Sequence, residues 1–314
     1  MKLTIVITVF NKEPYLRRVF ESVLNQQDAQ IDDYEVLAVN DGSTDGSSKI
    51  LEEYKLKDKR VRVLTHQNQG LSMARNNGVK EAKGDYVWFV DADDSIASNA
   101  VHLICKAISF HPDIIPIYAK TDGIEKVRNE VPKNVKSGKD ILLSYKWEAC
   151  GVFNVFRRSF LLDNDLSFYP GIFHEDVEFT PRVLYAAKSV VVIPEVLYTV
   201  YKTEGSITDI PKVKRAYDCL FVAESNNRII DNNNERGSKL GRALSVRVSI
   251  TITNSLNIMR QIDKKEWDKY NNELWSKRYL FSSMEQSGVF RYWLLAKLFR
   301  LFPKKYVQVF SLFK

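Results

Sequence analysis

Apolar and polar positions along residues 1–90 fall into two repeating patterns. Short, β-branched apolar runs predict strands at 2–10, 34–40, 61–65 and 86–90. Segments with helical spacing separate these runs: one covers 13–26, and the others end near Lys57 and Ala82. Because strand and helix alternate strictly, right-handed crossovers and a parallel sheet are expected. The predicted fold class is α/β.

The pattern changes in the second half of the chain. A helix is predicted at 176–187, and longer segments with helical spacing follow at 211–231, 239–261 and 264–281. Near the end, 290–302 is dense in aromatic and aliphatic residues. We therefore expect an α/β catalytic domain over 1–205 and a helical C-terminal region over 206–314.

Polar side chains follow the predicted strands. The run 86–90 passes without a spacer into Asp91-Ala92-Asp93-Asp94, and the run 34–40 ends at Asp41. Because ligands bind at the carboxyl edge of an open α/β sheet, Asp41, Arg75 and the Asp91 cluster are expected in one cleft. Two carboxylates one residue apart can hold a divalent ion that binds the phosphates of a nucleotide. The alternative is a turn whose Asp93 or Asp94 caps a helix beginning near Ala97.

Five sequence blocks, in order over residues 3–176, resemble family 2 glycosyltransferases of the GT-A fold. They are Thr8-Val9-Phe10-Asn11, Asn40-Asp41-Gly42-Ser43-Thr44-Asp45, Asn68-Gln69-Gly70 with Ala74-Arg75-Asn76, Asp91-Ala92-Asp93-Asp94, and His174-Glu175-Asp176. The resemblance covers about the first 205 residues. Thr8 stands where many members have proline, and Val155 where relatives often carry a basic residue.

The resemblance implies roles for these residues. Asp41 would contact the nucleotide base, Asp91 the ribose, and Asp93 a Mg²⁺ or Mn²⁺ ion, while Asp176 would be the catalytic base. The other residues assigned to the nucleotide pocket are Thr8, Phe10, Arg75 and Ala92. Contacts to the acceptor or the diphosphate are assigned to Trp147, His174, Glu175 and Lys202, with Tyr201 and Ser206 closing over the diphosphate beside Lys202.

Each block also has a purely structural interpretation. Asp41-Gly42-Ser43 can form a tight turn in which Asp45 caps the next helix, and Arg75 can be a solvated charge on a helix. Acidic residues such as Glu175 and Asp176 are favoured at a helix start whatever their function. His174 can be an ordinary loop histidine.

The function implied by the resemblance is an inverting glycosyl transfer. A single hexosyl or N-acetylhexosaminyl group would move from a nucleotide-diphosphate sugar, with uridine as the expected nucleoside, to a hydroxyl of a glycan or lipid-linked glycan, as in assembly of bacterial surface polysaccharide. The sequence lacks the Q-x-x-R-W block of processive synthases, so we expect one sugar per encounter. Two alternatives are a non-catalytic glycan-assembly partner with the same fold and a sugar nucleotidyltransferase, whose G-G-x-G-T-R loop is missing after the first strand.

Cysteine usage and hydropathy are typical of a cytoplasmic enzyme. Cys105, Cys150 and Cys219 are far apart and form no C-x-x-C pair, which disfavours structural zinc and a disulfide framework. The first strand starts directly after Met1, and no apolar run approaches the length of a membrane span, so neither a signal peptide nor an anchor is expected.

Basic charge is concentrated near the C-terminus. From 236 to 314 there are 16 Lys and Arg against 5 Asp and Glu, whereas 1–235 has 30 against 34. Beside the apolar segment 290–302, this charge predicts peripheral attachment to an anionic membrane at the inner face of the cell membrane. The alternative is a helix that packs on the catalytic domain or on a second subunit. Nucleic acid is not an expected partner, because no nucleic-acid module is present.

Overall fold

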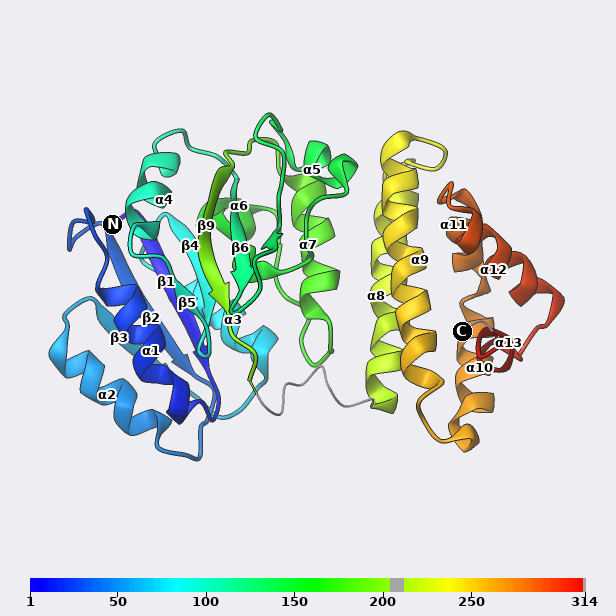
Figure 1. Ribbon diagram of the computed structural model, residues 1–314, viewed down its shortest axis with the longest axis horizontal. Helices are drawn as coiled ribbons and strands as arrows, with labels where there is room; N and C mark the ends of the chain where they lie inside the picture. Colours follow the sequence, from blue (N-terminus) through cyan, green and yellow to red (C-terminus); the bar gives the residue numbers. More distant parts are fainter. Residues whose placement is uncertain (204–211, 313–314) are drawn as a thin grey trace. The chain divides into compact units, whose positions relative to one another are not determined.

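The computed structural model describes residues 1–203 and 212–312 (Figure 1). The chain forms two compact units. The first contains Met1–Gly171 and Ala186–Glu204, and the second contains Ile172–Tyr185 and Gly205–Lys314. This division differs from the expected boundary at 205, because most of α7 (Glu175–Ala186) belongs to the second unit.

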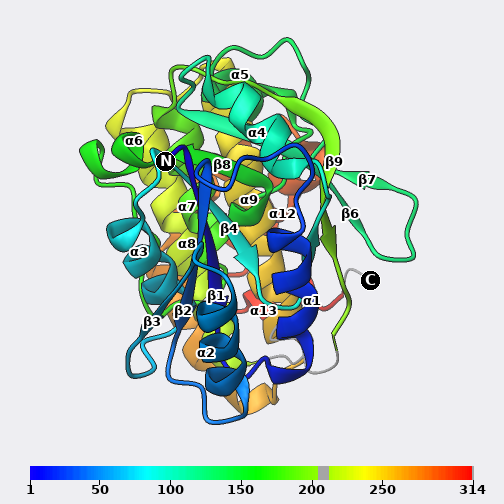
Figure 2. The same cartoon turned by 90° about the vertical axis from the view of Figure 1, so that its left-hand side faces the viewer.

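The first unit begins with a parallel sheet. Its strands are β1 (Leu3–Val9), β2 (Tyr34–Asn40), β3 (Val61–Thr65) and β4 (Tyr86–Asp91), in the order β3-β2-β1-β4. The connecting helices are α1 (Glu13–Leu24), α2 (Ser47–Lys57) and α3 (Leu71–Glu81). Since β4 pairs on the other side of β1 from β2, a right-handed crossover places α3 on the face opposite α1 (Figure 2). The expected α/β pattern is confirmed in these elements.

The register of the sheet aligns the strand ends. Val9 lies opposite Asn40, and Thr8 lies opposite both Val39 and Asp91. The residues that follow β1, β2 and β4 therefore emerge at one edge. This alignment is what brings polar residues from distant parts of the sequence together.

The sheet continues beyond β4 with mixed strand directions, in the order β8-β6-β9-β5. Strand β8 (Asn154–Arg157) is antiparallel to both β4 and β6 (Ile114–Thr121), and β9 (Ile193–Val200) is parallel to β6. The short β7 (Val127–Arg128) pairs with β6. The remaining helical elements of this unit are α4 (Ala100–Ile108), α5 (Gly138–Ser144), η1 (Gly151–Phe153) and α6 (Arg158–Asp163).

The helix expected near Ala97 starts three residues later, at Ala100. Before it, β5 (Ser95–Ile96) pairs antiparallel with β9. This pairing keeps the chain extended after Asp94, and Asn99 occupies the N-cap position. The interpretation of Asp93 or Asp94 as the cap of this helix is therefore wrong.

A buried aromatic cluster fills the first unit behind β4. Trp88 contacts Tyr198 edge-on, and Phe89 does the same with Phe168. The Trp88 indole donates a hydrogen bond of 2.9 Å to the Val152 carbonyl, so its polar atom is satisfied inside the core. This packing fixes the strand that carries Asp91.

The second unit is helical. Besides α7 it contains α8 (Val213–Asn232), α9 (Lys239–Met259), η2 (Lys264–Glu266), α10 (Trp267–Ser276), η3 (Arg278–Leu280), α11 (Phe281–Gln286), α12 (Phe290–Leu301) and α13 (Tyr306–Phe310). Within residues 1–203 and 212–312, none of the helices combines the length and apolar character needed to cross a membrane.

The continuous helix expected over 264–281 is divided. Helix α10 buries Tyr270 and Leu274, and the next positions on that face of an unbroken helix would be Lys277 and Arg278. The chain turns there instead, and α11 then buries Phe281 and Met284. The break keeps two cationic side chains out of the core.

Candidate functional site

Asp41 is buried directly after β2, where it ties the strand end to the start of α3. Its two carboxylate oxygens accept backbone hydrogen bonds from Gln69 and Gly70, each 2.8 Å long. Next to it, Gly42 has φ +73°, and a Cβ there would lie 2.7 Å from the Asn68 nitrogen, so a side chain is excluded. The Asp41 carboxylate thus holds in place the loop before α3, which borders this part of the sheet edge.

The structural interpretation of this block is partly right. Asp45 does order the start of α2, since its carboxylate accepts a 3.0 Å hydrogen bond from the Ser47 backbone. Asp41 is not merely a turn residue, because it bonds to a segment more than 25 residues away in the sequence.

Arg75 projects from α3 into the interior and is 2 % exposed. Its Nη2 donates to Asp91 Oδ1 at 3.1 Å, and its guanidinium lies over the Phe168 and Phe89 rings. The interpretation of Arg75 as a solvated charge is therefore wrong. A buried guanidinium paired with Asp91 orients that carboxylate at the sheet edge.

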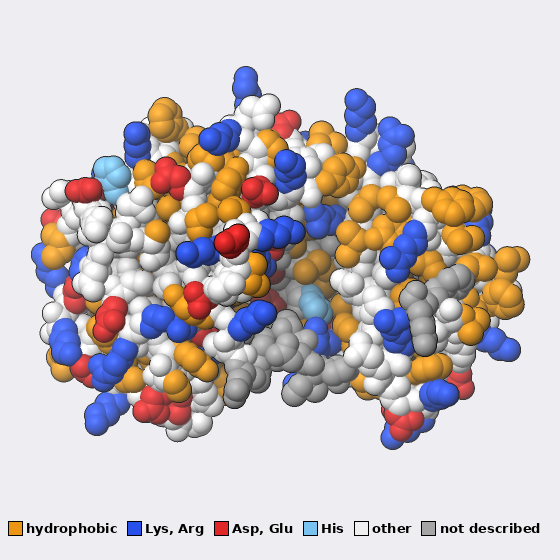
Figure 3. All heavy atoms as spheres, in the orientation of Figure 1, with side chains coloured by type: hydrophobic (Ala, Val, Ile, Leu, Met, Phe, Trp, Pro, Cys, Tyr) orange, Lys and Arg blue, Asp and Glu red, His pale blue; other side chains and the backbone are white. Residues whose placement is uncertain are grey.

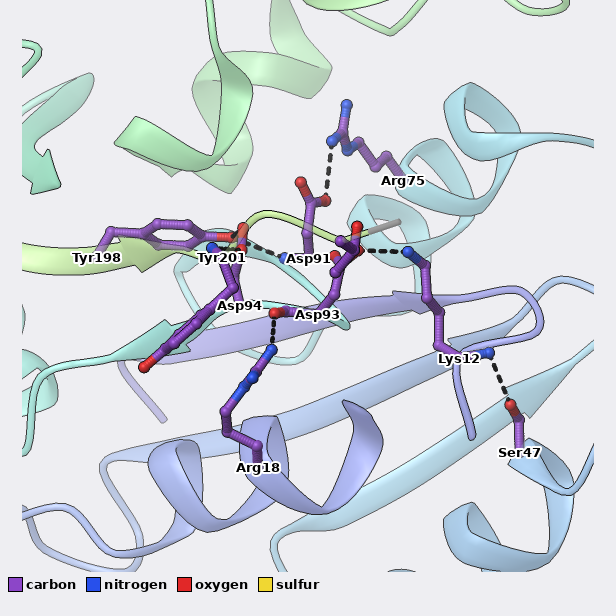
Figure 4. Close-up of polar contacts among 10 residues, drawn as sticks. Lys12, Arg18, Ser47, Arg75, Asp91, Asp93, Asp94, Tyr198 and Tyr201 are labelled. Carbon is purple, nitrogen blue, oxygen red and sulfur yellow. Dashed lines mark hydrogen bonds and ion pairs between the residues drawn. The ribbon is translucent and has the colours of Figure 1, made fainter. Parts of the chain in front are cut away.

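The three aspartates after β4 differ in environment (Figure 4). The Asp91 side chain is 35 % exposed, Asp93 is less so, and Asp94 is buried. Asp94 accepts hydrogen bonds from the Tyr198 hydroxyl at 2.7 Å and the Tyr201 backbone at 2.9 Å. Burial, reinforced by the charge of Asp91, raises the pKa of Asp94 to about 7. Asp94 is therefore a structural member of the cluster, while Asp91 reaches solvent and Asp93 does so to a smaller extent.

Two cations that the sequence analysis did not single out contact this cluster. The Lys12 ammonium forms an ion pair with Asp93 Oδ2, and Arg18 donates to the Asp93 carbonyl (Figure 4). The Lys12 backbone is itself held by a 3.0 Å hydrogen bond to Ser47 Oγ. The position of Lys12, three residues after the end of the first strand at the carboxyl edge, was the available signal.

The segment after β9 also lies against the cluster. Thr203 Oγ1 is 3.2 Å from Asp93 Oδ2, and the Arg18 guanidinium stacks 3.8 Å above the Tyr201 ring. Lys202, between them, is exposed. Ser206, expected beside Lys202, lies outside the described residues.

The other expected residues of the first unit occupy different settings. Thr8 is next to Asp91 in the sheet register, Phe10 is half-exposed just beyond β1, and Ala92 is buried between the aspartates. Trp147 is buried before η1, and Val155 is buried in β8 opposite Trp88. Thr8, Phe10 and Ala92 thus surround the strand ends, whereas Trp147 belongs to the core.

Asp176 lies in the first turn of α7, in the second unit. The preceding His174 has φ +64°, and its carbonyl accepts hydrogen bonds from the Val177 and Glu178 backbones. Burial, together with the charge of Arg215, lowers the pKa of His174, so the ring is neutral at pH 7. Glu178 is buried and paired with Arg182 at 2.7 Å, whereas Glu175 and Asp176 are partly exposed. The first turn of α7 therefore combines a structural carboxylate with two that reach solvent.

Comparison with known proteins assigns the family. The model of glycosyl transferase family 2 matches residues 4–165, just over half of the chain. The chain belongs to this family. The match spans the strand ends that carry Asp41, Asp91 and Asp93 and the helix that carries Arg75, and it stops before His174-Glu175-Asp176. The resemblance is confirmed at the level of the family.

Three proteins illustrate the relationship. The uncharacterized glycosyltransferase EpsJ of Bacillus subtilis is 30 % identical over 67 % of this chain and 63 % of its own length. The minor teichoic acid biosynthesis protein GgaA of the same species is 29 % identical over 66 % of this chain and 49 % of its own length. This chain therefore spans less than two thirds of either relative. The structure of residues 1–349 of Staphylococcus aureus TarS with UDP-GlcNAc has a TM-score of 0.77 at 20 % identity, covering 99 % of this chain and 90 % of that one.

The TarS match extends over both units and confirms the expected GT-A architecture with its helical C-terminal region. Among residues 1–203 and 212–312, no group of three His, Cys, Asp or Glu side chains is arranged to hold a metal ion. The side chains assigned to substrate and metal contacts stay predictions.

Proposed function

We propose that this protein is an inverting glycosyltransferase that moves one sugar from a nucleotide-diphosphate sugar to a hydroxyl of a glycan or lipid-linked glycan. The observation that carries the proposal is the convergence of Asp41, Asp91 and Asp93 at the aligned ends of β2 and β4. In α/β sheets this edge is where nucleotides bind. Uridine diphosphate is the proposed carrier, and the sugar is hexosyl or N-acetylhexosaminyl.

The donor pocket is proposed to use groups that are already held in place. Asp91, oriented by Arg75, faces outward and can accept hydrogen bonds from ribose hydroxyls. Asp41, bonded to the start of α3, is assigned to the base side of the pocket. Thr8, Phe10 and Ala92 supply backbone and apolar surface between them. Because these groups are fixed before the donor arrives, little ordering remains to oppose binding.

The carboxylates fit a divalent ion that is shared with the donor. Asp93 carries a cation already, since the Lys12 ammonium lies on its carboxylate, so the position attracts positive charge. Mg²⁺ in nucleotide enzymes is commonly held by one or two carboxylates, with phosphate oxygens as further ligands. Asp93 would hold Mg²⁺ or Mn²⁺ in this way, beside Asp91. When bound, the ion would neutralise charge on the departing diphosphate.

Asp176 is the proposed catalytic base. It would take the proton of the acceptor hydroxyl as the oxygen attacks the anomeric carbon opposite the leaving group, so no covalent intermediate forms. Neutral His174, which precedes it, adds no competing charge. Acceptor or diphosphate contacts are proposed for His174, Glu175 and Lys202, of which Lys202 is exposed and cationic. Trp147 is left out of the proposal because its side chain is buried in the core.

The acceptor is proposed to be a surface polysaccharide or its lipid-linked precursor. The relative GgaA, named for teichoic acid biosynthesis, supports this class. The excess of basic residues over 236–314 supports a peripheral position on the anionic inner face of the cell membrane. There, cytoplasmic nucleotide sugars and a lipid-linked acceptor meet.

A panel of nucleotide sugars tests the proposal. We expect one donor to bind in a metal-dependent manner and to hydrolyse slowly without an acceptor. Binding without turnover, even with extracts containing lipid-linked glycans, would favour the non-catalytic alternative. Release of pyrophosphate from a nucleoside triphosphate would identify a nucleotidyltransferase.

A further inference from the structure

The C-terminal helices carry a surface cavity of about 440 Å³ whose lining is cationic and hydroxylic. It is lined by Ser276, Arg278, Tyr279, Ser282 and Arg300. Arg278 is exposed and donates to the Trp275 carbonyl, and Arg300 pairs with Glu285 at 3.1 Å. Each guanidinium has five N–H donors, so both retain donors for a ligand. Two guanidinium groups beside three hydroxyl groups form a setting suited to a phosphate.

Helix α12 places an apolar ridge beside this cavity. Leu295, Ala296 and Phe299 are buried against the neighbouring helices. The opposite face exposes large apolar side chains, namely Phe290 (72 %), Trp293 (42 %), Leu294 (37 %) and Leu301 (71 %). Lys297 lies among them, with its ammonium over the Trp293 ring and paired with Glu285 at 3.2 Å. Figure 3 shows hydrophobic side chains gathered over these helices. The helix thus has one apolar face inside the protein and a second one in solvent, which monomeric proteins seldom leave uncovered.

The ridge and the cavity share one side of α12. Arg300 follows Trp293 by two helical turns, and Leu301 is its neighbour in sequence. A ligand with a phosphate in the cavity would therefore have its apolar part next to Trp293 and Leu301. Membrane phospholipids have this combination of groups.

We propose that this cavity binds the phosphate headgroup of an anionic membrane lipid while the α12 ridge lies in the interfacial layer. Segment 236–314 supplies charge complementarity, with 16 Lys and Arg against 5 Asp and Glu. A second copy of the chain is a poorer occupant. A two-fold contact would bring like charges together, because Arg278 and Arg300 of each copy would face the same surface of the other.

This inference builds on the proposed membrane position, but its readout is vesicle binding, so it can fail while sugar transfer stands. The test is sedimentation with phosphatidylcholine vesicles, with and without phosphatidylglycerol. We expect Arg278→Gln with Arg300→Gln to lower partitioning onto the anionic vesicles by about tenfold or more. Donor hydrolysis should be unchanged, since neither residue is assigned to the donor pocket.

A matched pair of double substitutions distinguishes a specific headgroup site from a diffuse attraction between basic residues and the anionic vesicle surface. Lys304→Gln with Lys305→Gln removes the same charge from the exposed turn between α12 and α13, and the loss of partitioning should be about tenfold smaller than for the arginine pair. Equal losses for the two pairs would overturn the proposal. So would full binding by Arg278→Lys with Arg300→Lys, which keeps the charge but loses the bidentate geometry.

Competition with inorganic phosphate distinguishes a lipid from a free anion. Phosphate binding that depends on the two arginines, with vesicle binding unaffected by them, would assign the cavity to a soluble anion and overturn the lipid site. Dimerisation through the ridge would also overturn the lipid site. It would be seen as a molecular mass that rises with protein concentration, and Trp293→Ser would abolish this rise without any effect on vesicle binding.

Discussion

The ammonium group of Lys12 lies on the carboxylate of Asp93, the side chain assigned to the metal. A divalent ion that binds Asp93 must therefore compete with the Lys12 ammonium. The Lys12 backbone is held in place by its hydrogen bond to Ser47. A partly buried ion pair contributes on the order of 1 kcal/mol.

Replacing Lys12 with Met should therefore tighten Mn²⁺ binding by about fivefold in the donor-free protein, because competition for Asp93 is removed. The measurement is the free Mn²⁺ signal in electron paramagnetic resonance titrations. Lys2→Met, which breaks a similar pair with Asp33, is the control and should change nothing. Unchanged or weaker Mn²⁺ binding by Lys12→Met would show that Lys12 does not compete with the ion.

Asp93→Ala should abolish transfer and weaken metal-dependent donor binding, because a carboxylate ligand is lost. Isothermal titration with the preferred nucleotide sugar, with and without Mg²⁺, checks this. An excess of chelator should have the same effect on the wild-type protein. Full activity in chelator would contradict a role for the metal.

Asp176→Asn should lower the transfer rate by about 10² to 10⁴, because the amide cannot accept the proton. Asparagine keeps the shape and is tolerated at a helix start, so stability should change by no more than about 1 kcal/mol. Donor binding should stay close to normal, because Asp41, Asp91 and Asp93 are intact. The measurements are steady-state transfer kinetics, donor titration and thermal unfolding.

Glu175→Gln is the control for this assignment, since Glu175 lies in the same helical turn and is also partly exposed. Its effect on transfer should be milder. If Glu175→Gln is the more damaging change, the base is Glu175 rather than Asp176.

Asp113 should make stability depend on pH in the acid range. It is buried before β6, and its carboxylate pairs with Arg157 and accepts hydrogen bonds from the Lys188 and Ser189 backbones. Burial alone would raise the pKa of Asp113, but these partners outweigh it and lower the pKa below the usual 3.8. The ionised form is thus favoured in the folded state, and its stabilisation is present above about pH 4 and lost as the pH falls below that value.

Asp113→Asn should accordingly cost about 1 to 3 kcal/mol at pH 7 and less near pH 3. Urea unfolding at the two pH values measures the difference, with exposed Asp32→Asn as a neutral control. A cost that is the same at both pH values would show that the charge of Asp113 contributes nothing.

Two neighbouring positions of α12 should respond differently to truncation. Phe299 is fully buried and contacts the rings of Phe281 and Tyr306, whereas Leu301 is 71 % exposed. Phe299→Ala should lower the free energy of unfolding by about 3 to 5 kcal/mol and Leu301→Ala by less than about 0.5. Chemical denaturation checks both. Equal effects would mean that α12 does not pack as described.

The burial of Phe299 and its neighbours also bears on the two interpretations of the 290–302 segment. One face packs on α11 and α13 of the C-terminal region, which are not the partners that the packing alternative named, and the other carries the exposed ridge. Deleting the segment would remove buried side chains together with exposed ones. Surface substitutions are therefore the better test of membrane binding.

The sequence by itself determined the elements over residues 1–91 and the edge at which their strands end. Short runs rich in apolar residues, such as 34–40, favour strands, and their alternation with helices leaves a parallel sheet as the solution. Once the strands are parallel, the residues after β2 and β4 must meet, so Asp41 and the Asp91 cluster could be placed together in advance.

Tertiary structure decided which charges are buried and with what they pair. Nothing local distinguishes Arg75, buried against Phe168, from a solvated arginine on a helix, because its burial depends on aromatic side chains from distant segments. Likewise, Asp94 and Asp93 are adjacent in sequence, yet Asp94 accepts a hydrogen bond from Tyr198 whereas Asp93 pairs with Lys12. The break between α10 and α11 and the two apolar faces of α12 were also decided by tertiary packing. Helical periodicity in the sequence shows which positions share a face, but only the packing shows which face other helices cover.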